Sequence, residues 1–132
     1  MKILLLTICA IIGMSQQVNF NKLLEDFEDE VEKEAKQCYA DFHINRQQLD
    51  SMLKVLYLPD DRNLKCFLAC TYLHFNVADE TGALTNKIKD YIDVDEPIIE
   101  KMLSICKDIE GNDVCEKVFN EINCLRRVVK EF

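Results

Sequence analysis

The residues of this chain best able to do chemistry are its cysteines. Seven are present, and one of them, Cys9, lies in an apolar N-terminal run. The other six are separated by 27, 3, 35, 8 and 8 residues, and they are Cys38, Cys66, Cys70, Cys106, Cys115 and Cys124. Zinc sites combine a short cysteine pair with a second pair or with histidines, whereas this chain has one C-x3-C and only two histidines. The spacing therefore predicts three disulfides and no metal or other cofactor.

An apolar leader predicts that the protein is exported. Lys2 is followed by about ten apolar residues and then by Gly13 and Ser15, which suit the −3 and −1 positions of a cleavage site. We expect residues 1–15 to be a secretory signal peptide and residues 16–132 to be one extracellular domain. The run is shorter than the roughly 20 residues needed to cross a bilayer, so an N-terminal membrane anchor is the less favoured alternative and no membrane insertion is expected.

The charge of the chain disfavours anionic partners. Without its leader the chain would keep 15 Lys and Arg residues against 24 Asp and Glu residues. Nucleic acids and anionic membrane surfaces attract basic proteins, so we expect neither as a partner. A monomer or weak homodimer that stays dispersed at high concentration fits this acidic balance.

Catalytic patterns are weak. Beyond the leader the chain has two serines, Ser51 and Ser104, no GxSxG motif and no cysteine left over from the three disulfides. The many carboxylates are best interpreted as a solvated acidic surface. We therefore expect no catalytic residue and no enzyme activity, and a small secreted hydrolase is retained as an alternative that a turnover assay would detect.

The elements that must position the cysteines are helices. Gly and Pro number only three and two, which favours an all-α chain with short loops. Apolar residues at steps of three and four predict six helices. They run from Phe20 to Cys38, from a cap at Asn45 to a stop at Pro59, over about 62–75, over about 84–92, from Pro97 to Gly111, and from a cap at Asn112 or Asp113 through Leu125. The inward stripe of the fifth helix is expected to be Ile98, Met102, Ile105 and Ile109.

Helical geometry limits how the cysteines can pair. Cys66 and Cys70 are four residues apart and share one face of their helix, so a bond between them would distort it. Cys115 and Cys124 are nine residues apart and, at roughly 100° per residue, point from opposite faces. Excluding these two bonds removes five of the fifteen possible pairings and leaves ten open.

The combined cysteine pattern resembles that of the six-cysteine insect odorant-binding proteins, the pheromone and general odorant-binding (PBP/GOBP) family. The stretch from Leu64 through Cys70, the acidic turn 79–82 and the stretch from Cys106 through Glu116 are similar to segments of that family. The resemblance implies a compact bundle of about six helices around an apolar cavity. It also implies three interlocked disulfides, namely Cys38–Cys70, Cys66–Cys115 and Cys106–Cys124.

The resemblance also implies a function. The protein would carry small hydrophobic ligands such as odorants or pheromones through aqueous sensory lymph, with an olfactory receptor as a further partner. The residues expected to line the ligand cavity are Leu53, Leu56, Phe67, Leu68, Leu73, Phe75, Ile88, Tyr91, Met102, Ile105, Val118, Phe119, Ile122 and Phe132. Candidate polar anchors are Tyr57, Tyr72 and Tyr91; candidate pH-sensitive groups are His43 and His74; and a candidate lid is Val128, Val129 and Phe132.

One alternative keeps the fold and changes the role. The same bundle would serve as a lipophile carrier in venom, saliva or reproductive fluid, or as a signalling protein that acts through its surface. The site of expression separates the first of these from an olfactory carrier, and uptake of an apolar probe separates the second.

Overall fold

The regular structure in the described part of this computed structural model is helical, apart from one isolated β-bridge between Ala78 and Leu84. The structure describes residues 20–54, 58–90 and 95–129. The helices are α2 (Phe20–Glu34), α3 (Lys36–Asp41), α4 (Arg46–Leu53), α5 (Arg62–His74), the 3-10 helix η2 (Asn86–Asp90), α6 (Glu96–Cys106) and α7 (Val114–Val129). The prediction of an all-α fold is confirmed.

Several helices begin where the sequence places a capping residue. Asn45 accepts a hydrogen bond from the backbone N–H of Gln48 (2.8 Å), and Gln48 accepts one from the backbone N–H of Asn45 (2.9 Å), which forms a capping box at the start of α4. Asp61 caps α5, and Asp113 accepts from the third N–H of α7. Pro97 stands in the first turn of α6, where its missing N–H costs nothing.

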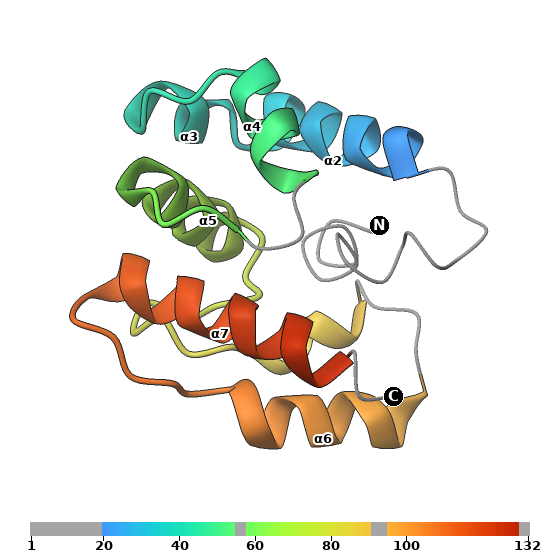
Figure 1. Ribbon diagram of the computed structural model, residues 1–132. Helices are drawn as coiled ribbons and strands as arrows, with labels where there is room; N and C mark the ends of the chain where they lie inside the picture. Colours follow the sequence, from blue (N-terminus) through green and yellow to red (C-terminus); the bar gives the residue numbers. More distant parts are fainter. Residues whose placement is uncertain (1–19, 55–57, 91–94, 130–132) are drawn as a thin grey trace.

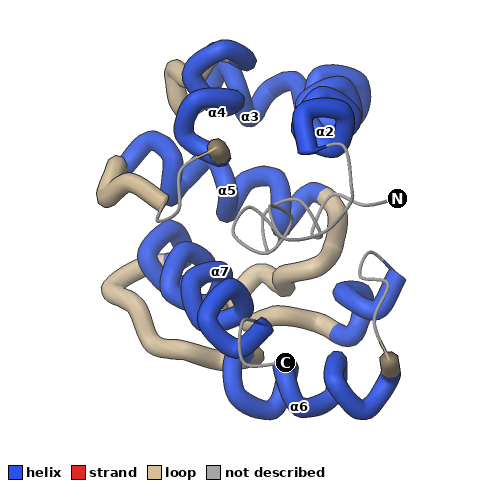
Figure 2. The backbone as a smooth tube through the Cα atoms, turned by 45° about the vertical axis from the view of Figure 1, so that its right-hand side comes forward, coloured by secondary structure: helices blue, strands red, loops and turns tan. Residues whose placement is uncertain are grey.

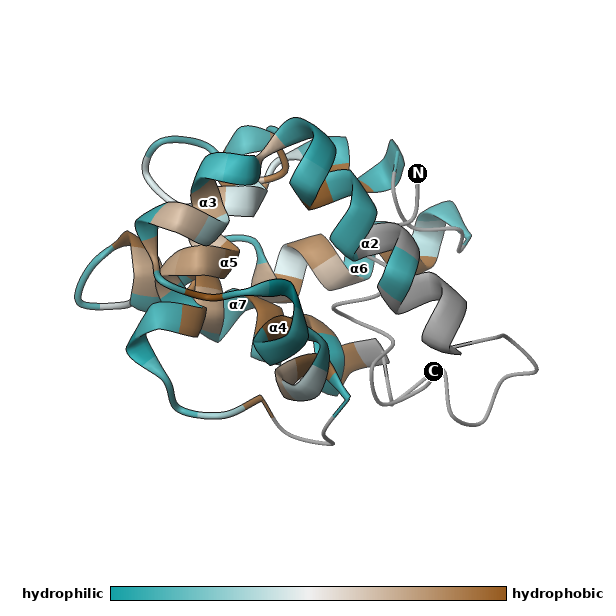
Figure 3. Cartoon of the chain, turned by 90° about the horizontal axis from the view of Figure 1, so that it is seen from above, coloured by the Kyte–Doolittle hydropathy of each residue, from teal (hydrophilic) through white to brown (hydrophobic). Residues whose placement is uncertain are grey.

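The helices stack around α5 (Figure 1). Helices α2, α3 and α4 pack together on one side, with α3 in contact with α5, and α7 packs against the other side of α5. Helix α6 lies beyond α7 and packs on it, and η2 is in contact with α6. The rotated view in Figure 2 keeps this order. Helix α5 is therefore the central element, and Phe67, Leu68 and Tyr72 on it are almost completely buried. Figure 3 shows hydrophobic residues concentrated along α5 in the middle of the molecule.

The first predicted helix is in fact two. The chain leaves helical geometry at Ala35 (φ −138°, ψ 39°), which separates α2 from α3. Ala35 is fully buried, and beyond the break Cys38 bonds to Cys70 on α5. The change of direction brings α3 against α5, so a tertiary requirement overrides an apolar pattern that runs through without a breaker.

Two further predicted helices differ in extent. The segment predicted as a helix over about 84–92 contains a 3-10 helix at residues 86–90, preceded by the bridge to Leu84. Helix α4 ends at Leu53, before the predicted stop at Pro59, and Leu56 lies outside the described residues.

The inward face of α6 matches the predicted one only in part: Met102 is buried as predicted, and Ile98 and Ile109 are half-buried against the core. The buried residues are Ile99, Met102, Leu103 and Cys106. Ile105, which we expected to line the interior, is 47% exposed. The disulfide of Cys106 with Cys124 directs that residue toward α7, and Ile105, one residue earlier and about 100° around the helix, consequently points away.

Candidate ligand-binding site

Three disulfides fix the helices that surround the interior. Their S–S distances are 2.02, 2.08 and 2.00 Å, and the bonded pairs are Cys38–Cys70, Cys66–Cys115 and Cys106–Cys124. These are the pairs that the family resemblance implied. They join α3 to α5, α5 to α7, and α6 to α7. Each of these three helix–helix contacts therefore carries a covalent link.

Most of the predicted lining residues meet in one apolar cluster. Eight of them have at most 7% of their surface exposed and belong to the same buried group: Leu53, Phe67, Leu68, Ile88, Met102, Val118, Phe119 and Ile122. We call these eight residues the central cluster. They come from α4, α5, η2, α6 and α7, so five segments distant in sequence contribute side chains to one apolar volume.

The other predicted lining residues are less deeply placed. Leu73 and Phe75, at the end of α5, are half-buried, and Ile105 is exposed. Leu56, Tyr91 and Phe132 lie outside the described residues, and their assignment to the site stays a prediction.

The candidate anchors, pH sensors and lid have mixed positions. Tyr72 is buried, whereas Tyr57 lies outside the described residues, as does Tyr91. His43 and His74 are both exposed, and His74 contacts the ring of Phe75 edge-on (5.3 Å between ring centroids). The candidate lid residue Val128 is buried in the core as part of α7; the side chain of Val129 and the whole of Phe132 lie outside the description.

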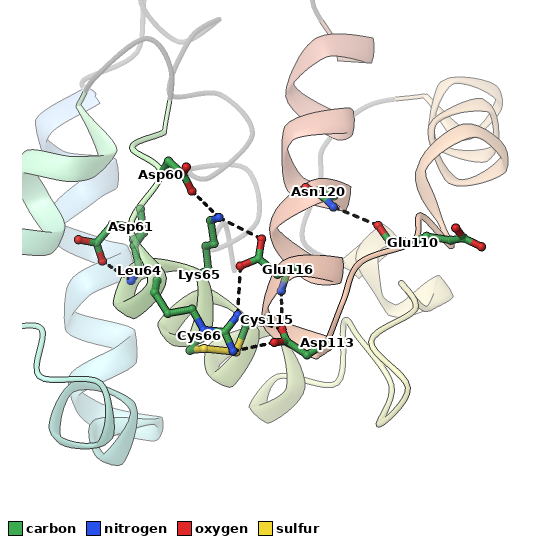
Figure 4. A network of polar contacts seen from close by, with 11 residues as sticks. Asp60, Asp61, Leu64, Lys65, Cys66, Glu110, Asp113, Cys115, Glu116 and Asn120 are labelled. Carbon is green, nitrogen blue, oxygen red and sulfur yellow. Dashed lines mark hydrogen bonds and ion pairs between the residues drawn. A yellow bond between two sulfur atoms is a disulfide. The ribbon is translucent and has the colours of Figure 1, made fainter.

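A lysine closes one end of the central cluster. The ammonium of Lys65 lies 4.9 Å from the centroid of the Phe119 ring, close enough for a cation–π interaction. The same nitrogen pairs with Glu116 (3.0 Å) and with Asp60 (Figure 4). Its charge is therefore matched by two carboxylates while the ammonium itself lies over the aromatic ring, so this end carries charged groups beside an apolar one.

A second cation strengthens the same end. Arg62 donates to both carboxylate oxygens of Asp113 (3.1 and 2.8 Å) and to Glu116 (3.1 Å). These contacts join the first turns of α5 and α7 beside the Cys66–Cys115 disulfide (Figure 4). Because Arg62 is exposed, its ion pairs add little energy, and the disulfide is the main constraint here.

Two buried glutamates were missed by the sequence analysis. Glu28 on α2 and Glu121 on α7 are 4% and 0% exposed. Burial raises the pKa of each carboxyl to about 7. At Glu28 the hydrogen bond with Arg46 lowers the pKa in part. At Glu121 the N–H of Ile109 and the charge of Lys117 do the same. The sequence did indicate their burial. Each glutamate lies three or four residues from apolar residues on the buried side of its own helix, where a charge is costly.

A surface hollow of about 540 Å³ lies beside the start of α7. It is lined by Glu110, Gly111, Asn112, Glu116, Lys117 and Asn120. Figure 4 shows Asn120 bonded to the carbonyl of Glu110 across this region (3.0 Å). Its lining is charged or polar, which does not suit an apolar ligand.

Two other kinds of site are not found within residues 20–54, 58–90 and 95–129. No three His, Cys, Asp or Glu side chains gather there as metal ligands. Nor does that part of the chain contain a helix that is long and apolar enough to span a bilayer.

The described residues form a disulfide-linked helical frame around an apolar cluster. The model of the PBP/GOBP family matches residues 21–128, and the chain belongs to this family. The family consists of proteins that bind and carry small hydrophobic ligands, is not enzymatic, and is typically extracellular. Neither the curated proteins nor the solved structures gave a match.

Proposed function

We propose that this protein is an exported carrier of small lipophilic signals, such as odorants or pheromones, that move through aqueous sensory lymph. The observation that carries the proposal is the central cluster: eight buried apolar side chains from five segments, framed by three disulfides. Family membership supplies the ligand class.

The energetics of such binding follow from apolar burial. A ligand that buries about 300 Å² of its own apolar surface and a similar area of protein surface gains roughly 15 kcal/mol at about 25 cal/mol per Å². Loss of translational and rotational freedom costs about 4 to 15 kcal/mol, so a micromolar affinity, which needs about 8 kcal/mol of net gain, is within range. The disulfides contribute by holding the frame while the ligand, and not a side chain, fills part of the interior.

Export is part of the proposal. The predicted signal peptide, residues 1–15, would direct the chain to an oxidising compartment in which the three disulfides form. The mass of the secreted protein tests this directly: it should begin at Gln16 and lack six hydrogens relative to the reduced chain.

Uptake of a fluorescent apolar probe, followed by displacement with small esters and alcohols, tests the carrier function. We expect one probe per chain. Ile122→Ala should weaken binding about tenfold, because Ile122 is fully buried in the central cluster, and Ile105→Ala should leave it unchanged, because Ile105 is exposed. Circular dichroism confirms that each variant is folded. Absence of probe uptake by the wild-type protein refutes the proposal, and a loss with Ile105→Ala but not Ile122→Ala places the ligand elsewhere.

A further inference from the structure

Helix α2 lies outside the disulfide frame. None of the three disulfides attaches to it, and its main packing contacts are with α3 and α4. Figure 1 shows these three helices in the layer farthest from α6. The chain leaves helical geometry at Ala35, and three residues further on Cys38 is bonded to Cys70 of α5. Movement of α2 about Ala35 would therefore break no covalent link and would leave α3 in place.

One side chain of α4 holds two turns of α2. The guanidinium of Arg46 donates from Nε to Glu28 (2.9 Å) and from Nη1 to Glu32 (2.7 Å). Its Nη1 also pairs with Asp29 (2.6 Å), and its Nη2 donates to the backbone carbonyl of Glu25 (3.1 Å). The four contacted residues follow one another at steps of three, one and three along α2, so they lie on one side of the helix. Arg46 therefore fastens this side of α2 to the start of α4.

Among these contacts the pair of Arg46 with Glu28 matters most. Asp29 and Glu32 are more than half exposed, and ion pairs of exposed carboxylates add little energy. Glu28 is buried, and no donor among the described residues reaches its Oε2, so the hydrogen bond from Arg46 to Oε1 offsets part of the cost of burying this carboxyl. Opening of α2 returns Glu28 to water. Loss of Arg46 would therefore favour the open position.

Opening of α2 would also uncover one edge of the apolar core. Val31 of α2 is fully buried and belongs to the same apolar group as Leu53 and Phe67 of the central cluster. Leu53 is on α4, the helix on which α2 packs. We propose that α2 is a flap that turns about Ala35, is held closed by Arg46, and opens to admit ligands to the central cluster. The entry role rests on the proposed carrier function.

Hydrogen exchange of the oxidised, ligand-free protein tests the flap. After correction for intrinsic rates, wild-type amides 28–34 of α2 should exchange at least about a hundredfold faster than amides 66–72 of α5, which two disulfides hold. Arg46→Met should raise the opening constant of α2 by a further factor of about ten or more, because it leaves the buried Glu28 carboxyl without its donor. The amides of α5 should exchange as in the wild type.

Arg62→Met is the matched control. Arg62, like Arg46, is the first residue of its helix, and it pairs with the carboxylates of Asp113 and Glu116. It joins α5 to α7, which a disulfide already links, so its loss should leave the exchange of α2 unchanged. The flap is overturned if α2 and α5 are equally protected in the wild type, or if Arg46→Met and Arg62→Met have the same effect on α2.

Stopped-flow mixing with the fluorescent apolar probe tests the entry role. Because the flap is closed in both the free and the loaded protein, Arg46→Met should raise the association and dissociation rate constants together, by about tenfold, and leave Kd within about twofold. Arg62→Met should change neither rate constant. Uptake by the wild type at rates that Arg46→Met does not alter overturns the entry role alone. Absence of uptake by the wild type refutes the carrier function and the entry role together, while hydrogen exchange still decides whether α2 is a flap.

Discussion

Replacing Glu121 with Gln should make the protein more stable at alkaline pH than the wild type. The Glu121 carboxyl is completely buried. Its Oε2 accepts from the N–H of Ile109 (3.2 Å) and lies 3.6 Å from Nζ of Lys117, while no donor within the described residues reaches its Oε1. Lys117 divides its charge between this carboxylate and Asp108, so Glu121 is incompletely compensated.

The magnitude follows from linkage between proton binding and folding. Burial raises the pKa of Glu121 to about 7 from an ordinary value of 4.5. Because the folded-state pKa is the higher one, the stabilisation is fully present below pH 4.5 and is lost as the pH rises through 7. Between pH 5 and pH 8 the wild type should lose about 2 to 3 kcal/mol at this site, and Glu121→Gln should lose none of it.

Urea unfolding of both proteins at pH 5, 6, 7 and 8, with disulfides intact, measures the difference. Gln can still accept from Ile109, and any cost of its buried NH₂ group is the same at every pH, so the informative quantity is the change in the difference. Glu110→Gln, which removes an exposed carboxylate of the α6–α7 connection, should run parallel to the wild type. A constant difference between Glu121→Gln and wild type from pH 5 to pH 8 would refute the reasoning.

Two further predictions concern the frame. Removing the Cys66–Cys115 bond should lower the free energy of unfolding in urea by about 4 kcal/mol, and removing Cys106–Cys124 should lower it by about 3 kcal/mol. The two bonds close loops of 49 and 18 residues, and the unfolded chain gains more entropy when the longer loop is opened. Equal losses of stability, or losses in the reverse order, would contradict this reasoning. Gly111→Ala should cost at least 2 kcal/mol, since an added Cβ would lie 2.4 Å from a backbone nitrogen of α7; an unchanged unfolding midpoint would show that the connection can move aside.

The sequence allowed the helical frame to be predicted well. Asn45 was the predicted cap of one helix and Asn112 or Asp113 that of another; the structure confirms Asn45 and selects Asp113, because capping depends on local chemistry. The cysteine faces were likewise decided by local geometry: Cys66 and Cys70 do share a helix, and each reaches a different neighbouring helix. The choice among the ten remaining pairings came from the family resemblance.

What could not be predicted depends on contacts distant in sequence. Helix α6 is apolar at Ile98, Ile99, Met102, Leu103 and Ile105, so its periodicity permits more than one inward face. The disulfide at its last residue selects one of them and exposes Ile105.

The buried carboxyls show a related limit of the sequence. Twenty-four acidic residues make a solvated surface the natural interpretation of each one. Only the packing of α4 on α2, and of the α6–α7 connection on α7, reveals that Glu28 and Glu121 are enclosed.

Native mass spectrometry of the secreted, oxidised protein mixed with a small lipophilic ester tests the central claim most directly. We expect a chain that begins at Gln16, carries three disulfides and binds one ester molecule in a complex that is about tenfold weaker when Ile122 is replaced by Ala. A correctly oxidised protein that retains no ester and no other lipophile at micromolar concentration would contradict the carrier function.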